Sequence, residues 1–216
     1  RESGVAVRID ESDAVAEIRA VKTAEEIEHI RRAQRANERA MAAAESLLES
    51  ASVVEGILQR DGDPLTSEAV RREIEVTLVR EGCALDETIV ACGADAADPH
   101  DRGSGPLRAG ESIIVDIFPR SKETGYHGDL TRTFCVGEPG ETIEAWHDLT
   151  LEAQAAALET VEAGVSGSEV HGAVCDVYEG AGIPTLRADE TTETGFIHTT
   201  GHGVGLDVHE PPRISE

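Results

Sequence analysis

The amino-acid sequence predicts a fold of the α+β class, made of two similar halves in which helices are followed by antiparallel strands. Three observations predict it. Apolar residues recur at helical spacing in residues 23–48. Two β-branched runs, residues 113–118 and 129–136, flank a segment with turn-forming proline and glycine, as in a hairpin. The apolar stripe of residues 70–78 returns in residues 170–178, about a hundred residues later, which indicates two related halves with a site between them.

The helices of the first half have recognisable start and stop signals. Thr23 is followed three residues later by Glu26, which forms a capping box, so the first helix is expected to run from there to about Leu48. The second helix is expected to begin at Thr66 or Ser67 and to end at a glycine, over residues 66–82.

The second half repeats this order. A long alanine-rich helix is expected over residues 142–163, and a second capping box at Ser166 begins a helix that stops at Gly182. Trp146 and Tyr178 are expected at core positions of these helices. Residues 88–92 form a further strand of the first half.

Composition excludes several classes of partner. The chain has 43 acidic and 19 basic residues and a net charge of −24, which disfavours binding to nucleic acid or to an anionic membrane. Such acidity with only two lysines, Lys22 and Lys122, is expected of a halophilic protein, and the alternative is an ordinary acidic protein from a GC-rich genome. Four widely spaced cysteines and the absence of a signal peptide or a long apolar run favour a soluble, cytoplasmic protein.

Two carboxylates lie in the predicted hairpin. Asp116 interrupts an apolar strand, and Asp129 opens the strand that follows. Folding the hairpin brings them side by side, where two carboxylates repel each other unless one is protonated or a cation lies between them. We favour the cation.

A histidine cluster near the end of the chain supplies further candidate ligands, namely His198, His202 and His209. The glycines around His202 argue against a helix, and in an extended chain His198 and His202 lie about 13 Å apart, so one of them at most contacts a given ion. We select His202 as the ligand and leave His198 and His209 for the substrate. Two carboxylates and an imidazole suit manganese, cobalt, iron or zinc.

With these motifs the chain resembles the pita-bread metallopeptidases, and within them the branch of aminopeptidase P and prolidase. The resemblance covers about residues 20 to 216. It rests on Val115-Asp116, Gly128-Asp129-Leu-Thr-Arg-Thr-Phe, Asp98-Pro99-His100, His198-Thr-Thr-Gly-His202-Gly-Val-Gly and His209-Glu-Pro-Pro. It implies the pita-bread (creatinase/aminopeptidase) fold and a hydrolase that cleaves Xaa-Pro bonds in peptides with proline at the second position. The enzyme is expected to be cytoplasmic, and a homodimer is possible.

The resemblance also implies a role for each motif residue. Asp116, Asp129 and His202 would bind two divalent metal ions, Mn²⁺ or Co²⁺ first and Zn²⁺ or Fe²⁺ as alternatives, with Asp129 bridging them. His100 and His209 would contact the scissile peptide and its tetrahedral intermediate. His198 would line the pocket for proline. A hydroxide between the metals would attack the carbonyl.

The chain departs from the family pattern at its end. The family supplies two further metal-binding glutamates beyond His209-Glu-Pro-Pro, and this sequence stops at Glu216, so we expect a fragment that lacks the C-terminal strands and binds metal weakly. Residues 1–20 are interpreted as the remnant of an N-terminal domain and connector, and residues 21–216 as the incomplete pita-bread domain. Two alternatives remain: a non-catalytic module that binds peptides or proteins, and a metal-free hydrolase of the creatinase kind.

Overall fold

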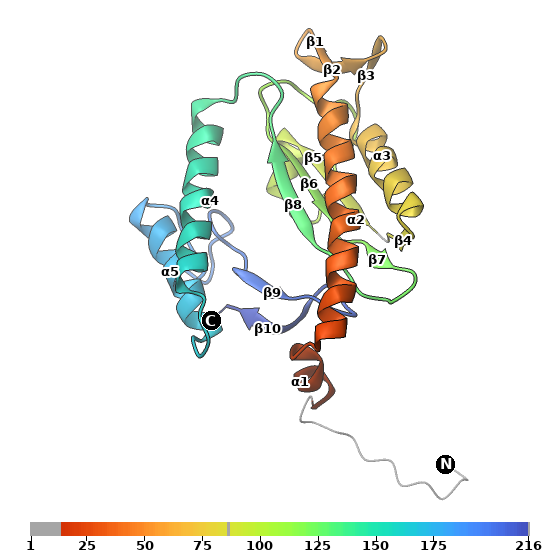
Figure 1. Ribbon diagram of the computed structural model, residues 1–216. Coiled ribbons are helices and arrows are strands. Elements are labelled where there is room, and N and C mark those ends of the chain that lie inside the picture. Colours follow the sequence, from red (N-terminus) through yellow and green to blue (C-terminus); the bar gives the residue numbers. More distant parts are fainter. Residues whose placement is uncertain (1–13, 86, 216) are drawn as a thin grey trace, which may run out of the picture.

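The computed structural model describes residues 14–85 and 87–215 of the chain. In the first half, two helices, α2 (Ala24–Glu49) and α3 (Ser67–Arg80), pack against a three-stranded antiparallel sheet in the order β5-β6-β8 (Figure 1). The strands of this sheet are β5 (Thr88–Cys92), β6 (Ile113–Ile117) and β8 (Leu130–Phe134).

Shorter elements complete the first half. They are α1 (Ala14–Ala20), β1 (Ser52–Val54), β2 (Ile57–Arg60), β3 (Asp63–Pro64), β4 (Cys83–Ala84), the 3₁₀ helix η1 (Gly93–Ala97) and β7 (Arg120–Ser121). Strands β1, β2 and β3 form a small antiparallel sheet beyond the C-terminal end of α2 (Figure 1). Strand β4 pairs with β7 beside the middle of α2 (Figure 1).

The second half contains two packed helices and one pair of strands. Helix α4 (Glu141–Thr160) lies beside α5 (Gly167–Gly180), and the antiparallel strands β9 (Gly201–Gly203) and β10 (Glu210–Ile214) lie between these helices and the first half (Figure 1). The expected order of helices followed by antiparallel strands in two halves is therefore observed.

Local signals explain where the helices begin. Both predicted capping boxes form: Thr23 accepts the amide of Glu26 while the Glu26 carboxylate accepts the amide of Thr23, and Ser166 and Glu169 make the same exchange. At the end of α3, Gly82 has φ +75°, which a residue with a side chain rarely adopts. These confirmed signals set the observed helix boundaries within a few residues of the predicted ones.

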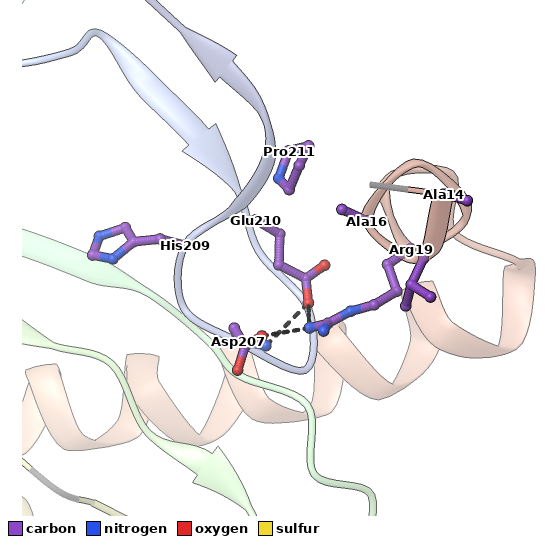
Figure 2. Close-up of a pocket in the computed structure, with 8 residues that line it drawn as sticks. Ala14, Ala16, Arg19, Asp207, His209, Glu210 and Pro211 are labelled. Atoms are coloured by element: carbon purple, nitrogen blue, oxygen red, sulfur yellow. Dashed lines mark hydrogen bonds and ion pairs between the residues drawn. The ribbon is translucent and has the colours of Figure 1, made fainter. Parts of the chain in front are cut away.

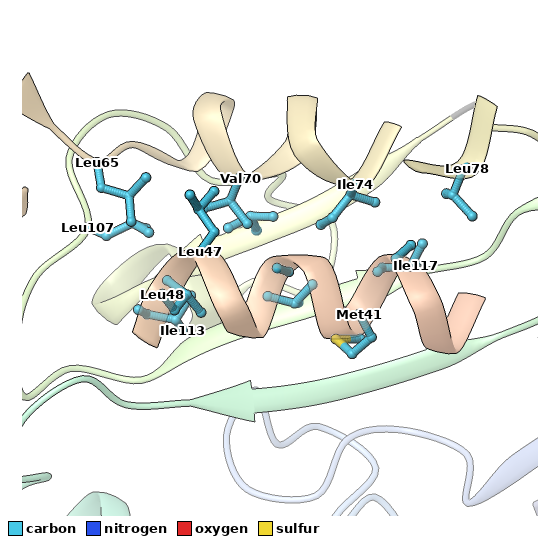
Figure 3. Packing of buried hydrophobic residues seen from close by; sticks show 14 of the residues in the cluster. Met41, Leu47, Leu48, Leu65, Val70, Ile74, Leu78, Leu107, Ile113 and Ile117 are labelled. Atoms are coloured by element: carbon cyan, nitrogen blue, oxygen red, sulfur yellow. The ribbon is translucent and has the colours of Figure 1, made fainter. Parts of the chain in front are cut away.

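The main core lies between α2, α3 and the sheet (Figure 3). Helix α2 presents a buried face rich in alanine, and these small side chains allow α3 and β6 to approach closely. Ile113, Val115 and Ile117 alternate along β6 and are fully buried on the face toward α2, which turns Asp116 to the opposite face. The core thus orients Asp116 toward the second half.

The second half has a smaller apolar cluster. Ala153 and Ala157 of α4 pack against Val170 and Val174 of α5. The expectation that Trp146 occupies a core position is wrong: its side chain is 59% exposed, because α4 extends beyond the region that α5 covers. Tyr178, also expected at a core position, is partly buried and packs against the cluster.

The described part of the N-terminal segment, residues 14–22, includes the short helix α1. Residues 14–20, in the segment interpreted as a domain remnant and connector, form α1, and none of its residues is buried. Helix α1 contacts β10 of the second half. Residues 1–13, the first part of the predicted domain remnant, lie outside the described residues, and the boundary at residues 20 and 21 stays a prediction. Within 14–85 and 87–215, no helix has the length and apolar character needed to cross a membrane.

Candidate functional site

The two aspartates come from adjacent strands of the β5-β6-β8 sheet. Asp116 is in β6, opposite Thr131 of β8, and the Thr131 hydroxyl donates a 2.6 Å hydrogen bond to its Oδ1. Because Ile117 pairs with Leu130, Asp129 lies one residue before the paired part of β8, close to the end of β6. Both carboxylates are half-buried. The strand pairing brings them to one region, as the sequence predicted, and Asp129 is close enough to act electrostatically on Asp116.

Within residues 14–85 and 87–215, no lysine or arginine forms an ion pair with either carboxylate, and His202 is the residue that pairs with Asp129. Burial raises the pKa of Asp116, and the neighbouring Asp129 raises it further, against the hydrogen bond from Thr131 and the attraction of His209. Burial also raises the pKa of Asp129, opposed by attraction to three histidines, His202, His209 and His127. The partners that favour their charged forms are therefore a hydroxyl, backbone amides and imidazoles.

His202 brings the second half to this region. It lies in β9, and its Nε2 is 3.3 Å from Oδ2 of Asp129, while its Nδ1 is 3.0 Å from the carbonyl oxygen of Gly203. A proton on Nδ1 donated to that carbonyl leaves the Nε2 lone pair directed toward Asp129, which is the arrangement that a metal-binding imidazole needs. Gly203 must be glycine, because a Cβ there would collide with the backbone of Pro211 in β10.

His209 completes the group that the structure brings together. Its ring packs edge-on against that of His202, with ring centroids 4.4 Å apart. The imidazole is exposed. The residue borders a cavity of about 430 Å³ between α1 and the β9–β10 connection, but its ring points to the other side of the backbone (Figure 2). Two imidazoles and two carboxylates from both halves thus meet at the junction between the halves.

The other two predicted residues do not join this group. His100 is exposed in the turn after η1, where its backbone amide donates to the Asp98 carboxylate over 2.8 Å. His198 is exposed in the segment before β9. Across residues 14–85 and 87–215, the structure records no contact of either imidazole with Asp116, Asp129 or His202.

The chemical character of the group fits a divalent cation, since hard carboxylate oxygens and an imidazole nitrogen are suitable ligands. The side chains are of suitable types, but they do not form a complete metal site. In the part of the chain that the structure describes, no three or more His, Cys, Asp or Glu side chains are grouped closely enough to hold a metal ion. Asp129 and His202 are the pair in direct contact.

Helix α2 supports the aspartates through two polar residues that sequence reasoning missed. The Gln34 side-chain oxygen accepts the amide of Asp129 over 3.0 Å, and Asn37 donates to the carbonyl of Ile117 over 2.7 Å. Gly128 lets the strand approach, because a Cβ there would lie 3.0 Å from the backbone of Ala33 and Gln34. A usable sequence signal was present, since Asn37 interrupts the alanine-rich stripe of α2 and is fully buried.

Sequence reasoning also missed a buried ionic cluster beside His209. Glu210 is 5% exposed, and its carboxylate pairs with Arg19 and with Lys22, whose Nζ is 2.9 Å from Oε2. Arg19 also contacts Asp207 over 2.7 Å, and the amide of Asp207 donates to Glu210 over 3.0 Å (Figure 2). The cluster gives no local sequence signal, because its cations precede its carboxylates by about 190 residues.

Comparison with known proteins gives consistent matches. A model of metallopeptidase family M24 matches residues 28–216. The probable dipeptidase PepE of Mycobacterium tuberculosis is 34% identical over 205 residues, which cover 94% of this chain and 48% of that protein. The Xaa-Pro dipeptidase of Pyrococcus furiosus is 31% identical over 208 residues, which cover 94% of this chain and 53% of that protein.

Solved structures give the same result. Prolidase from Pyrococcus furiosus superimposes with a TM-score of 0.78 at 30% identity, covering 94% of this chain and 54% of that one. An X-Pro aminopeptidase from Thermotoga maritima MSB8 superimposes with a TM-score of 0.77 at 30% identity, covering 94% of this chain and 52% of that one. The chain spans about half the length of the curated relatives it matches.

Proposed function

Because the chain belongs to metallopeptidase family M24 and shares the pita-bread fold of its structural neighbours, we propose that it forms the metal- and peptide-binding part of a peptidase that cleaves Xaa-Pro bonds. The relatives that carry the Xaa-Pro name support the substrate class. The observation that carries the proposal is the contact between Asp129 of the first half and His202 of the second, with Asp116 beside them.

In this proposal Asp116, Asp129 and His202 hold divalent cations, Mn²⁺ or Co²⁺ first. A bound cation would lower the pKa of a water molecule and polarise the scissile carbonyl. The chain's own residues orient the ligands: Thr131 fixes one oxygen of Asp116, and the Gly203 carbonyl fixes the His202 ring. Such supporting hydrogen bonds hold ligands in position before the cation arrives.

The remaining histidines are assigned to the substrate. His209, exposed and in ring contact with His202, is assigned the donation of a hydrogen bond to a peptide carbonyl that lies over the aspartates. His100 and His198 are proposed to reach the substrate from the two exposed segments that carry them. Their exposure leaves both imidazoles free to bind a peptide.

Metal binding tests the site directly. Isothermal titration calorimetry of this chain with Mn²⁺ and Co²⁺ should give binding that Asp116→Asn and His202→Gln weaken at least about 10-fold. Asp148→Asn and His147→Gln, at exposed positions of α4, are matched controls that should leave the affinity unchanged. Equal affinities in the site variants and the controls would overturn the assignment of ligands.

Activity tests the substrate class. Release of the N-terminal residue should be measured with an Xaa-Pro dipeptide and an Xaa-Pro tripeptide, and with Xaa-Ala analogues as controls. The assay should use this chain and any longer polypeptide from the same reading frame, each with added Mn²⁺ or Co²⁺. Cleavage of the Xaa-Ala peptides at the same rate would refute the proline preference, and no cleavage of any peptide by either polypeptide would refute the peptidase.

A second candidate is a pita-bread module that binds peptides without cleaving them. It is favoured by the lack, among the described residues, of a ready-made group of three metal ligands. The two candidates differ in calorimetry: the module binds an Xaa-Pro peptide without a divalent cation, whereas the peptidase needs the cation first.

A further inference from the structure

Glu210 is the most strongly held carboxylate near the candidate site. Its side chain is 4% exposed and has three donors: the guanidinium of Arg19, the ammonium of Lys22 and the amide of Asp207. Removing a carboxylate from water is costly unless charged partners replace the water. The two cations and the amide supply that compensation, so Glu210 is held in one place.

This anchoring constrains the loop that carries His209. Within residues 205–210, the Gly205 amide donates to the Asp207 carbonyl, and a Cβ at Gly205 would collide with the Glu210 carboxylate. The Gly205 carbonyl in turn accepts the amide of His127, next to Gly128 and Asp129. The loop therefore closes around the Glu210 side chain and is hydrogen-bonded to the segment before β8 that contains Asp129.

The cations lie before the residues that the family model matches. Arg19 and Lys22 precede residue 28, where the family match begins, and they lie at the end of α1 and in the turn before α2. In Figure 2, Arg19 reaches from α1 to the Glu210 carboxylate while His209 points away on the other side of the backbone. The N-terminal segment therefore contacts the loop of residues 205–210 on the side opposite to the His209 ring.

We propose that Glu210, clamped by Arg19 and Lys22, is a positioning residue that fixes the backbone of His209 so that its ring lies against His202. The clamp makes residues 14–22 a part of the site and not only a connector. The inference rests on the proposed function only in giving His209 a role toward the substrate. The geometry that it concerns exists in the metal-free chain and can be measured without any enzymatic activity.

The test uses NMR signals of the imidazoles in the metal-free chain. Because the rings of His202 and His209 are in edge contact, their chemical shifts report on their mutual orientation. Glu210→Gln and Lys22→Met should shift the His209 ring signals, and Lys22→Arg should restore them because it keeps the charge. Lys122→Met is the matched control: Lys122 is the other lysine of the chain, it is exposed, and its substitution should leave the signals in place.

A clamp that only stabilises the fold gives a different result. In that case Lys22→Met lowers the thermal midpoint but leaves the His202 and His209 signals where they are, and this outcome would overturn the proposal. If Glu210→Gln fails to fold, Lys22→Met still decides the question, because it removes one of three donors. Where the chain cleaves peptides, the positioning variants should also lose roughly 10-fold in kcat/KM, and Lys122→Met should not.

Discussion

Glu210 should make the free energy of unfolding of this protein fall at acidic pH, and Glu210→Gln should remove this part of the pH dependence. Burial acts to raise the pKa of Glu210, but the hydrogen bonds from Lys22, the Asp207 amide and Arg19 outweigh it and lower the pKa to about 2, from an ordinary value of 4.5. A carboxylate whose pKa is lower in the folded protein stabilises the fold above the unfolded pKa. This stabilisation is lost as the pH falls from about 4.5 to about 2.

The magnitude follows from the difference between the two pKa values. Each pKa unit corresponds to about 1.4 kcal/mol, so the ionised Glu210 contributes on the order of 3 kcal/mol to the free energy of unfolding at pH 7. At pH 3, between the two pKa values, roughly half of this remains. Glu210→Gln removes the ionisable group and with it this part of the pH dependence.

Urea denaturation at pH 7 and pH 3 measures the effect. The difference in unfolding free energy between the wild-type chain and Glu210→Gln should be large at pH 7 and clearly smaller at pH 3. Taking the difference between the two proteins cancels the titration of the chain's other acidic groups, as long as those groups lie away from Arg19, Lys22, Asp207 and Tyr126, which face Glu210. A difference that stays constant between the two pH values would refute the reasoning.

Three further outcomes are expected. Ile74→Ala, at a fully buried position of α3 that faces α2, should lower the free energy of unfolding by about 2–5 kcal/mol in urea denaturation. Val79→Ala, at a 61% exposed position of α3, should change it by less than about 0.5 kcal/mol. Similar losses in the two variants would contradict the described core. Ser166→Ala removes the acceptor for the Glu169 amide and should cost about 1 kcal/mol, with reduced helicity by circular dichroism; unchanged stability and helicity would show that the cap is dispensable. Raising KCl from about 0.1 M to 1 M shortens the screening length from about 10 Å to 3 Å, so the thermal midpoint of this chain, with net charge −24, should rise, and a fall would refute self-repulsion as a main electrostatic term.

Much of the fold could be predicted because its signals are local. Capping boxes and apolar stripes are encoded within a few residues of one another, so the helix starts at Thr23 and Ser166 follow from adjacent side chains. The hairpin with Asp116 and Asp129 was also predictable, since two β-branched runs joined by a turn have few ways to pair. Trp146 was misjudged because helical spacing marks a face without showing how far the neighbouring helix extends.

The candidate site was predictable only in part. The proximity of Asp129 and His202 followed from chemistry, because buried carboxylates need positive or coordinating partners. The Glu210 clamp could not be foreseen, since Arg19 and Lys22 are common surface residues and nothing in their neighbourhood indicates a partner so far along the chain. Long-range ion pairs depend on how two packed units meet, and a single sequence does not encode that meeting as a pattern.

The two halves have separate apolar clusters, and the contacts between them include His202 with Asp129, the His127 amide with Gly205, and Arg19 and Lys22 with Glu210. Because these contacts are hydrogen bonds and ion pairs, the coupling between the halves depends on the charges of the groups that make them. A metal ion bound by Asp129 and His202 would hold the two halves together. Amide hydrogen exchange in β9 and β10 would then slow, while exchange in the interior of α3 would stay unchanged. The metal site that we propose would therefore also couple the two halves mechanically.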